Sequence, residues 1–197
     1  MSGLRVVGGI WKGRAIEAPV GRRVTRPTTA RTREAIASIV LSSFGLDLSG
    51  VAVLDAFAGS GALGLEMLSR GAASCTFVDG DRAAVSRMRR SIASLGAIPR
   101  TQVILGDVFK VAHCKTLHEA PFELVLLDPP YAMAAPRLAD LVKTLRLAGK
   151  LAPQARIVYE RAAKAPPLCC DAMTLATSSS HGGTAVDLFV VTDEEAI

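Results

Sequence analysis

The sequence contains no apolar run long enough to cross a membrane and few of the residues that bind metals. Its hydrophobic stretches stay short of the roughly 18 residues that a span needs, and residues 1–14 lack the apolar core of a secretory signal. The four cysteines and three histidines show none of the spacings typical of a zinc site. We therefore expect a cytoplasmic protein with reduced thiols, no bound metal and no membrane contact.

Aromatic residues are also scarce, at 5% of the chain against 50% hydrophobic residues overall. This composition suits aliphatic strands and helices rich in Ala and Leu, and 197 residues fit one α/β domain. Residues 1–40 hold eight basic and two acidic residues, a balance of +6, whereas the remaining 157 residues sum to −1. A localised basic segment fits a polyanionic partner, although a solvated charged face would give the same pattern.

The first 40 residues predict a small basic unit. The sequence predicts a β-hairpin over residues 4–18, with its turn at Trp11, and a loop over residues 21–29. From Ala30 the apolar spacing becomes helical, with Thr28 or Thr29 as the N-cap.

From Val51 onward, short apolar segments alternate with segments of helical periodicity. Strands are expected over 51–57, 73–79, 101–107, 122–128, 155–160, 173–179 and 184–191, and helices over 62–70, 81–95, 108–119 and 136–147. This alternation is typical of βαβ units. It predicts an α/β fold with a seven-stranded, mostly parallel sheet, an antiparallel edge strand and a small N-terminal hairpin and helix.

Polar or conformationally special residues follow four consecutive predicted strands. They are Asp55, Phe57, Gly59, Ser60 and Gly61 after the first strand, Asp79 after the second, Asp107 and Val108 after the third, and Asp128, Pro129, Pro130 and Tyr131 after the fourth. Parallel α/β sheets bind ligands beyond the carboxyl ends of their strands, where the strand order reverses. The four strand ends therefore predict one site.

The fourth strand end carries the most distinctive chemistry. Two consecutive prolines fix the backbone after Asp128 and contribute no N–H group, so this segment is stiff and rich in acceptors. A carboxylate, a carbonyl and the Tyr131 ring could bind and stack a planar amino group. A strand end followed by an ordinary turn is the simpler alternative.

The motif GSGALG at residues 59–64 also satisfies the GxGxxG pattern of dinucleotide-binding proteins. A pyrophosphate gains nothing from the nearby carboxylate of Asp55, whereas the cationic amino group of S-adenosylmethionine would. We expect S-adenosylmethionine as the cofactor, with Asp79 binding the ribose hydroxyls and Asp107 the adenine amino group. The adjoining VDGD sequence leaves Asp81 as an alternative to Asp79.

The segments LRVVGGIWKGRAI, RPTTARTREAI, LDAFAGSGALGLEMLSRGA and LLDPPY together resemble the ribosomal RNA small-subunit methyltransferase D family. The resemblance implies a Rossmann-like class I methyltransferase domain at residues 41–197, preceded by a basic RNA-binding extension at residues 1–40. It also implies methyl transfer to the exocyclic N2 of one guanine (966 in the family) in 16S rRNA.

This interpretation assigns a role in methyl transfer to residues at the end of the fourth strand. Asp128 and the carbonyl of Pro129 would accept the amino hydrogens, and Tyr131 would stack on a base that has left its helix. The final proton could leave through Asp128 or directly to water. Arg26, Arg31 and Arg33 are expected to bind RNA phosphates, unless they are ordinary helix-surface arginines.

Other functions remain open on the sequence alone. A DNA adenine-N6 methyltransferase or a protein-glutamine methylase would use the same chemistry at the fourth strand end, and a noncatalytic nucleotide- or RNA-binding module would need only the fold. The expected partner is small-subunit rRNA, within an assembling ribosomal subunit, and the protein is expected to be a monomer.

Overall fold

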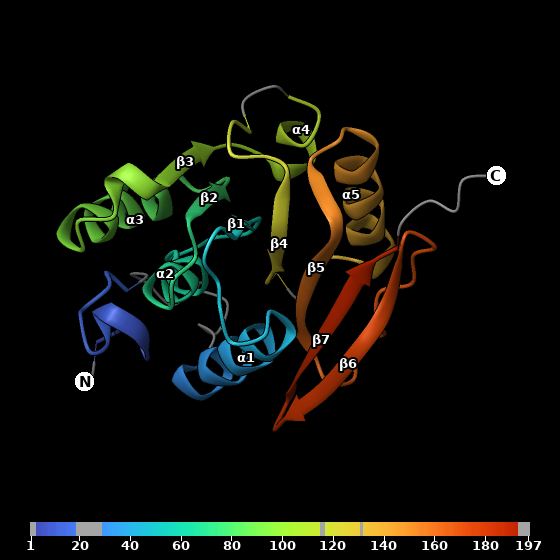
Figure 1. Cartoon of the computed structure of the whole chain (residues 1–197), viewed down its shortest axis with the longest axis horizontal. Coiled ribbons are helices and arrows are strands. Elements are labelled where there is room, and N and C mark those ends of the chain that lie inside the picture. Colours follow the sequence, from blue (N-terminus) through green and yellow to red (C-terminus); the bar gives the residue numbers. More distant parts are fainter. Residues whose placement is uncertain (1–2, 19–28, 115–116, 131, 193–197) are drawn as a thin grey trace.

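The chain forms one seven-stranded sheet with helices on both faces (Figure 1). The computed structural model describes residues 3–18, 29–114, 117–130 and 132–192. The strands are β1 (Ala52–Asp55), β2 (Ser74–Asp79), β3 (Thr101–Leu105), β4 (Phe122–Leu127), β5 (Leu151–Ala162), β6 (Met173–His181) and β7 (Thr184–Val191). The helices are α1 (Ala30–Ser43), α2 (Ala62–Ser69), α3 (Arg82–Ser94), α4 (Val108–Val111) and α5 (Ala135–Leu147), with 3-10 turns η1 (Gly9–Trp11) and η2 (Ile98–Arg100).

The strand order is β3-β2-β1-β4-β5-β7-β6. Strands β1 to β5 run parallel, and β7 lies antiparallel to both β5 and β6. The predicted seven-stranded, mostly parallel sheet with an antiparallel strand at its edge region is thus confirmed. The order reverses between β1 and β4, so the ends of these two strands mark the place where a ligand is expected.

The central strands are buried on both faces, which explains their continuous apolar sequences. Val53 and Leu126 pack into one hydrophobic cluster together with α1, α2 and α3. Leu54 and Val125 point the other way, into a second cluster with α4 and α5. Figure 1 shows these two sets of helices on opposite sides of the sheet.

Short polar side chains cap the starts of α1 and α3, and the cap predicted at Thr29 is confirmed. The Thr29 side chain accepts a hydrogen bond from the Thr32 N–H at 3.1 Å and caps α1. Asp81 accepts from the Ala83 N–H at 2.8 Å and caps α3. Each bond satisfies a backbone donor that the first helical turn leaves unpaired.

The N-terminal hairpin is less regular than predicted. Arg5 and Ala15 form one isolated antiparallel bridge, and η1 occupies the bend between them. Backbone hydrogen bonds from Val6 to Arg14, from Gly13 to Val6 and from Ile16 to Leu4 still join its two arms. Two further backbone N–H groups of the segment bind the Glu66 side chain of α2. The loop predicted over residues 21–29 lies outside the described residues except for Thr29.

Two other elements differ from their predicted length. Helix α4 ends at Val111 rather than 119, because the N–H groups of His113 and Cys114 bond three residues back and tighten the last turn. Strand β5 begins at Leu151 rather than 155. Its pairing with β4 shifts register opposite Glu123, and this irregularity accommodates Pro153 within a strand.

Among the helices of the described residues, none combines the length and the apolar character needed to cross a membrane. The N-terminal segment, residues 3–18, packs into the same hydrophobic cluster as α2 through Val6, Trp11 and Ile16. The division of the chain into a basic extension (1–40) and a methyltransferase domain (41–197) stays a prediction.

Candidate active site

The carboxyl ends of the first four strands surround a cavity of about 420 Å³. This volume lies within the range of small-molecule sites. Seven predicted site residues line it, namely Phe57, Gly59, Asp79, Asp107, Val108, Asp128 and Pro130. The other lining residues are Ala56, Gly80, Asp81, Gly106, Phe109, Met133 and Arg137. The predicted convergence of four strand ends on one site is therefore present in the fold.

The loop after β1 depends on glycine for two different reasons. Gly59 and Gly61 adopt φ values of +53° and +76°, which side chains rarely tolerate. At Gly64 the φ is ordinary, but an added Cβ would lie 2.4 Å from the Phe77 ring. The first two glycines allow the turn, and the third allows α2 to pack closely on the sheet. Ser60 and Gly61 themselves do not line the cavity.

Asp55 lies beneath this loop and does not line the cavity. It is 1% exposed, and its Oδ2 accepts a hydrogen bond from the Gly64 N–H at 3.0 Å. Burial raises its pKa to about 7, the Gly64 N–H opposes that rise, and the nearby charges of Asp128 and Asp79 add to it. In this structure Asp55 holds the loop in place, and its role in binding the cofactor stays a prediction.

Asp79 connects the first and second strand ends. Its Oδ2 accepts from the Gly59 N–H at 2.7 Å, and its Oδ1 accepts from the Asp81 N–H at 2.7 Å. Asp81 also lines the cavity, but its side chain caps α3. A carboxylate has four lone-pair sites, so Asp79 can still accept hydrogen bonds from a ligand.

Aromatic rings form an apolar part of the cavity wall. The Phe57 and Phe109 ring centroids are 6.2 Å apart, and the Arg137 guanidinium lies 4.1 Å from the Phe109 centroid. Asp107 stands beside this wall and caps α4 through a 3.0 Å bond from the Phe109 N–H. A flat ring could therefore bind against Phe57 with a carboxylate at its edge.

The residues after β4 separate this cavity from a second hollow of about 300 Å³. Asp128 lines the first cavity, Pro129 lines the second, and Pro130 lines both. The Pro130 carbonyl accepts from the Met133 N–H at 2.8 Å, whereas no described residue donates a backbone hydrogen bond to the Pro129 carbonyl. Tyr131 lies outside the described residues.

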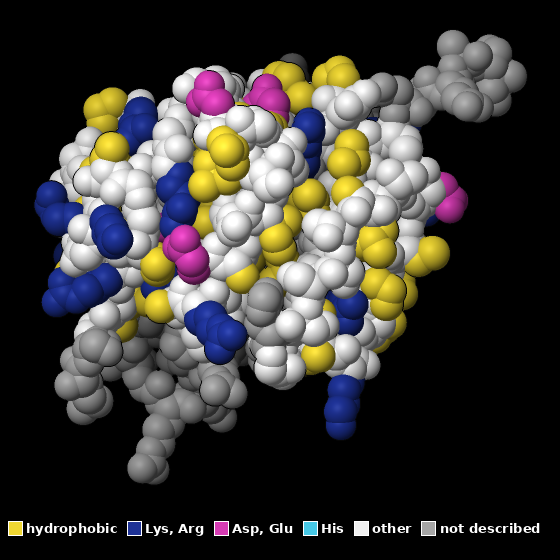
Figure 2. Space-filling view, turned by 60° about the horizontal axis from the view of Figure 1, so that its bottom comes forward, with side chains coloured by type: hydrophobic (Ala, Val, Ile, Leu, Met, Phe, Trp, Pro, Cys, Tyr) yellow, Lys and Arg dark blue, Asp and Glu magenta, His cyan; other side chains and the backbone are white. Residues whose placement is uncertain are grey.

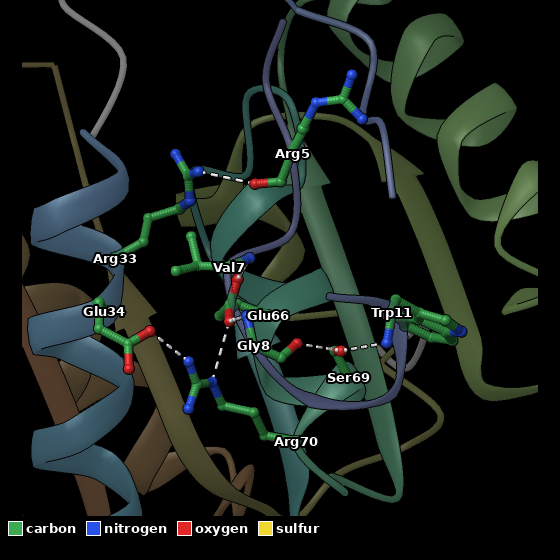
Figure 3. Close-up of polar contacts among 9 residues, drawn as sticks. All are labelled: Arg5, Val7, Gly8, Trp11, Arg33, Glu34, Glu66, Ser69 and Arg70. Atoms are coloured by element: carbon green, nitrogen blue, oxygen red, sulfur yellow. Dashed lines mark hydrogen bonds and ion pairs between the residues drawn. The ribbon is translucent and has the colours of Figure 1, made fainter. Parts of the chain in front are cut away.

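The three arginines predicted to bind RNA differ in accessibility. Arg31 is exposed near the start of α1 and lines an open hollow with Val7 and Glu34. Arg33 is only 2% exposed and donates to the Arg5 carbonyl at 2.9 Å (Figure 3). Burial lowers its pKa. The prediction that Arg33 binds phosphate is therefore corrected to a structural role; Arg26 lies outside the described residues.

A buried polar cluster missed by the sequence reasoning attaches the N-terminal segment to α2 (Figure 3). Glu66 is fully buried and accepts from the N–H groups of Val7 and Gly8 at 2.8 and 2.7 Å. Arg70 donates to Glu66 at 3.0 Å and pairs with Glu34 of α1. A lone carboxylate inside the apolar sequence ALGLEMLS was the available signal, because such a charge must be paired when buried.

Comparisons with known proteins agree with this geometry. The model of the family described as "Conserved hypothetical protein 95" matches residues 4–190. The ribosomal RNA small subunit methyltransferase D of Escherichia coli is 35% identical over 157 residues, which cover 80% of this chain and 74% of that protein.

YlbH of Bacillus subtilis, provisionally named as an rRNA methyltransferase, is 38% identical over 128 residues, 65% of this chain and 67% of that one. A solved Escherichia coli protein provisionally named as a methyltransferase, yhhF, has a TM-score of 0.79 and 29% identity, covering 97% of this chain and 99% of that one. This chain belongs to the ribosomal RNA small-subunit methyltransferase D family.

Proposed function

We propose that the protein transfers a methyl group from S-adenosylmethionine to the exocyclic N2 of a guanine in small-subunit rRNA. The observation that carries this proposal is the position of Asp128 and Pro129. Their carboxylate and carbonyl stand at a rigid strand end, between a ligand-sized cavity and a second hollow. The membership in the family supports rRNA as the substrate.

The cavity fits S-adenosylmethionine better than a dinucleotide. The backbone N–H groups that would bind a pyrophosphate already have internal acceptors: Gly59 donates to Asp79 at 2.7 Å, Gly61 to the Ala58 carbonyl at 2.6 Å, and Gly64 to Asp55. Carboxylates at the cavity wall match the hydroxyl and amino donors of adenosine and methionine instead. In this assignment Asp79 binds the ribose and Asp107 the adenine amino group.

In this proposal the protein promotes the reaction by positioning the guanine amino group against the methyl group of the cofactor. When bound, S-adenosylmethionine supplies an electrophilic methyl group on a positively charged sulfur. Asp128 and the Pro129 carbonyl accept the two hydrogens of the guanine amino group and direct its lone pair toward the cavity. The second hollow gives the base room beside the two prolines, and Tyr131 follows directly in sequence as the stacking ring. The proton leaves through Asp128 or to water.

The test is to replace Asp128 by Ala and to compare it with Asp140→Ala, an exposed position on α5. We expect Asp128→Ala to lose about 100-fold or more in methyl transfer, with S-adenosylhomocysteine affinity within a few-fold of the wild type. Loss of cofactor binding together with transfer would contradict the role given to Asp128. Binding of NAD in place of S-adenosylhomocysteine would contradict the cofactor.

A further inference from the structure

A second basic stretch lies outside the N-terminal forty residues. Residues 82–100, which comprise α3 and η2, contain five arginines and no acidic residue. The charge count of the chain beyond residue 40 conceals this stretch, because acidic residues elsewhere cancel it. The positive charge of this protein is therefore not confined to its first forty residues.

The two segments are neighbours in the fold. Arg14 donates to the Ser94 carbonyl at 2.8 Å, and the Glu17 N–H donates to the Ser91 side chain at 2.9 Å. The Arg100 guanidinium lies 5.2 Å from the centroid of the Trp11 ring. Figure 2 shows Lys and Arg side chains gathered on the side of the molecule where Figure 1 places α3 and the N-terminal segment. We call this surface the basic face; it comprises Lys12, Arg14, Arg82, Arg87, Arg89, Arg90 and Arg100.

Most of the charge on the basic face is available to a partner. Glu17 binds Arg90 through two hydrogen bonds, at 2.7 and 2.6 Å. Hydrogen bonding to Arg90, together with the charges of Arg90 and Arg87, lowers the Glu17 pKa, as expected beside a cluster of cations. Lys12 and Arg82 are exposed, and within the described parts of the chain neither forms an ion pair.

The basic face starts at the candidate active site. Gly80 and Asp81 line the cavity, and α3 begins at the next residue. With 13 residues, α3 extends about 20 Å from that rim, at 1.5 Å per residue. Arg82 and Arg89 are seven residues apart and lie on one side of the helix, about 10 Å from each other along its axis.

We propose that the basic face binds the phosphates of the rRNA strand that leads away from the target nucleotide. This inference rests on the proposed function, because the same RNA must reach Asp128. Guanidinium groups suit phosphate oxygens, and contacts of this kind fix the register of a nucleic acid without reading its sequence. The α3 arginines therefore add a second phosphate contact region to the one expected at the start of α1.

The experiment compares Arg82→Gln/Arg89→Gln with Lys143→Gln/Lys164→Gln, which removes the same charge from exposed positions on α5 and after β5. The affinity for an unmodified transcript of small-subunit rRNA is measured from 50 to 400 mM KCl. Loss of two phosphate contacts should reduce the slope of log K against log[salt] by about 1.4 to 1.8 and weaken binding about tenfold or more near 0.1 M salt. S-adenosylhomocysteine affinity and thermal stability should stay unchanged.

A charge-conserving variant and the behaviour of the wild type complete the test. Arg82→Lys/Arg89→Lys keeps both charges and should retain most of the salt dependence. Unchanged rRNA affinity in the Gln variant would overturn the proposal; if binding to the assembled small subunit were then lost, the face would instead contact a ribosomal protein. If the wild type itself neither binds nor methylates rRNA, the proposed function fails, and that outcome is separate from any difference between the variants.

Discussion

The buried carboxyl of Asp55 should make the stability of the ligand-free protein depend on pH. Its pKa is raised from 3.8 to about 7, mainly by burial. In the unfolded chain the same carboxyl ionises near pH 4. Between these two values the folded state binds a proton that the unfolded state has lost. The free energy of unfolding therefore falls as the pH rises through this window, and the loss is complete above pH 7.

The size of this effect follows from the shift. Each pKa unit corresponds to about 1.36 kcal/mol, so the full difference is about 4 kcal/mol, and the part that falls between pH 5 and pH 8 is about 2.5 kcal/mol. Asp55→Asn removes the titration while its side-chain oxygen can still accept from the Gly64 N–H. As the pH rises from 5 to 8, the free energy of unfolding of the variant should therefore increase relative to that of the wild type by about 2.5 kcal/mol.

The assay is urea unfolding of the wild type and of Asp55→Asn at pH 5, 6.5 and 8 without ligand. Asp140→Asn, at an exposed site on α5, controls for the general effect of removing one carboxylate. A difference between wild type and Asp55→Asn that is the same at pH 5 and pH 8 would refute the reasoning. It would mean that Asp55 keeps one protonation state in the folded protein across this range.

Three other substitutions test the structural roles assigned above. Gly64→Ala should destabilise the fold by about 1–3 kcal/mol, because its Cβ would lie 2.4 Å from the Phe77 ring, whereas Gly183→Ala, with open space around it, should have little effect in the same unfolding assay. Glu66→Ala should cost about 3–5 kcal/mol because it leaves buried donors unpaired; unchanged urea unfolding would contradict that role. Arg33→Gln should lower stability by about 1–3 kcal/mol and leave the salt slope of rRNA binding unchanged; a reduced slope would restore its predicted contact with phosphate.

The sequence predicted the architecture of the site because the relevant signals are local. A short apolar run such as residues 122–127 predicts a strand buried on both faces, and the polar residues that follow it must lie at the edge of a parallel sheet. The elements that it predicted poorly depend on distant partners. Glu66 holds the N-terminal segment against α2, and its hydrogen bonds to that segment span 58 and 59 residues of sequence.

The roles of individual charges were harder to predict because burial is set by tertiary packing. Arg31 and Arg33 are two residues apart on α1, yet one is exposed and the other buried. Asp55 ends a strand, as a ligand-binding residue would, but the loop folds over it. The arginines of α3 had a visible signal in the absence of acidic residues over 82–100, which becomes informative once the fold brings them beside Arg14.

The most direct test of the proposed function is methyl transfer from labelled S-adenosylmethionine to small ribosomal subunits that lack the modification, followed by nucleoside analysis. The proposal predicts label in N2-methylguanosine of the small-subunit rRNA, at a rate reduced about 100-fold or more when Asp128 is replaced by Ala. Label in protein, or label only in DNA adenine when DNA is offered instead, with none in guanosine, would contradict the substrate while leaving the fold and the cofactor in place.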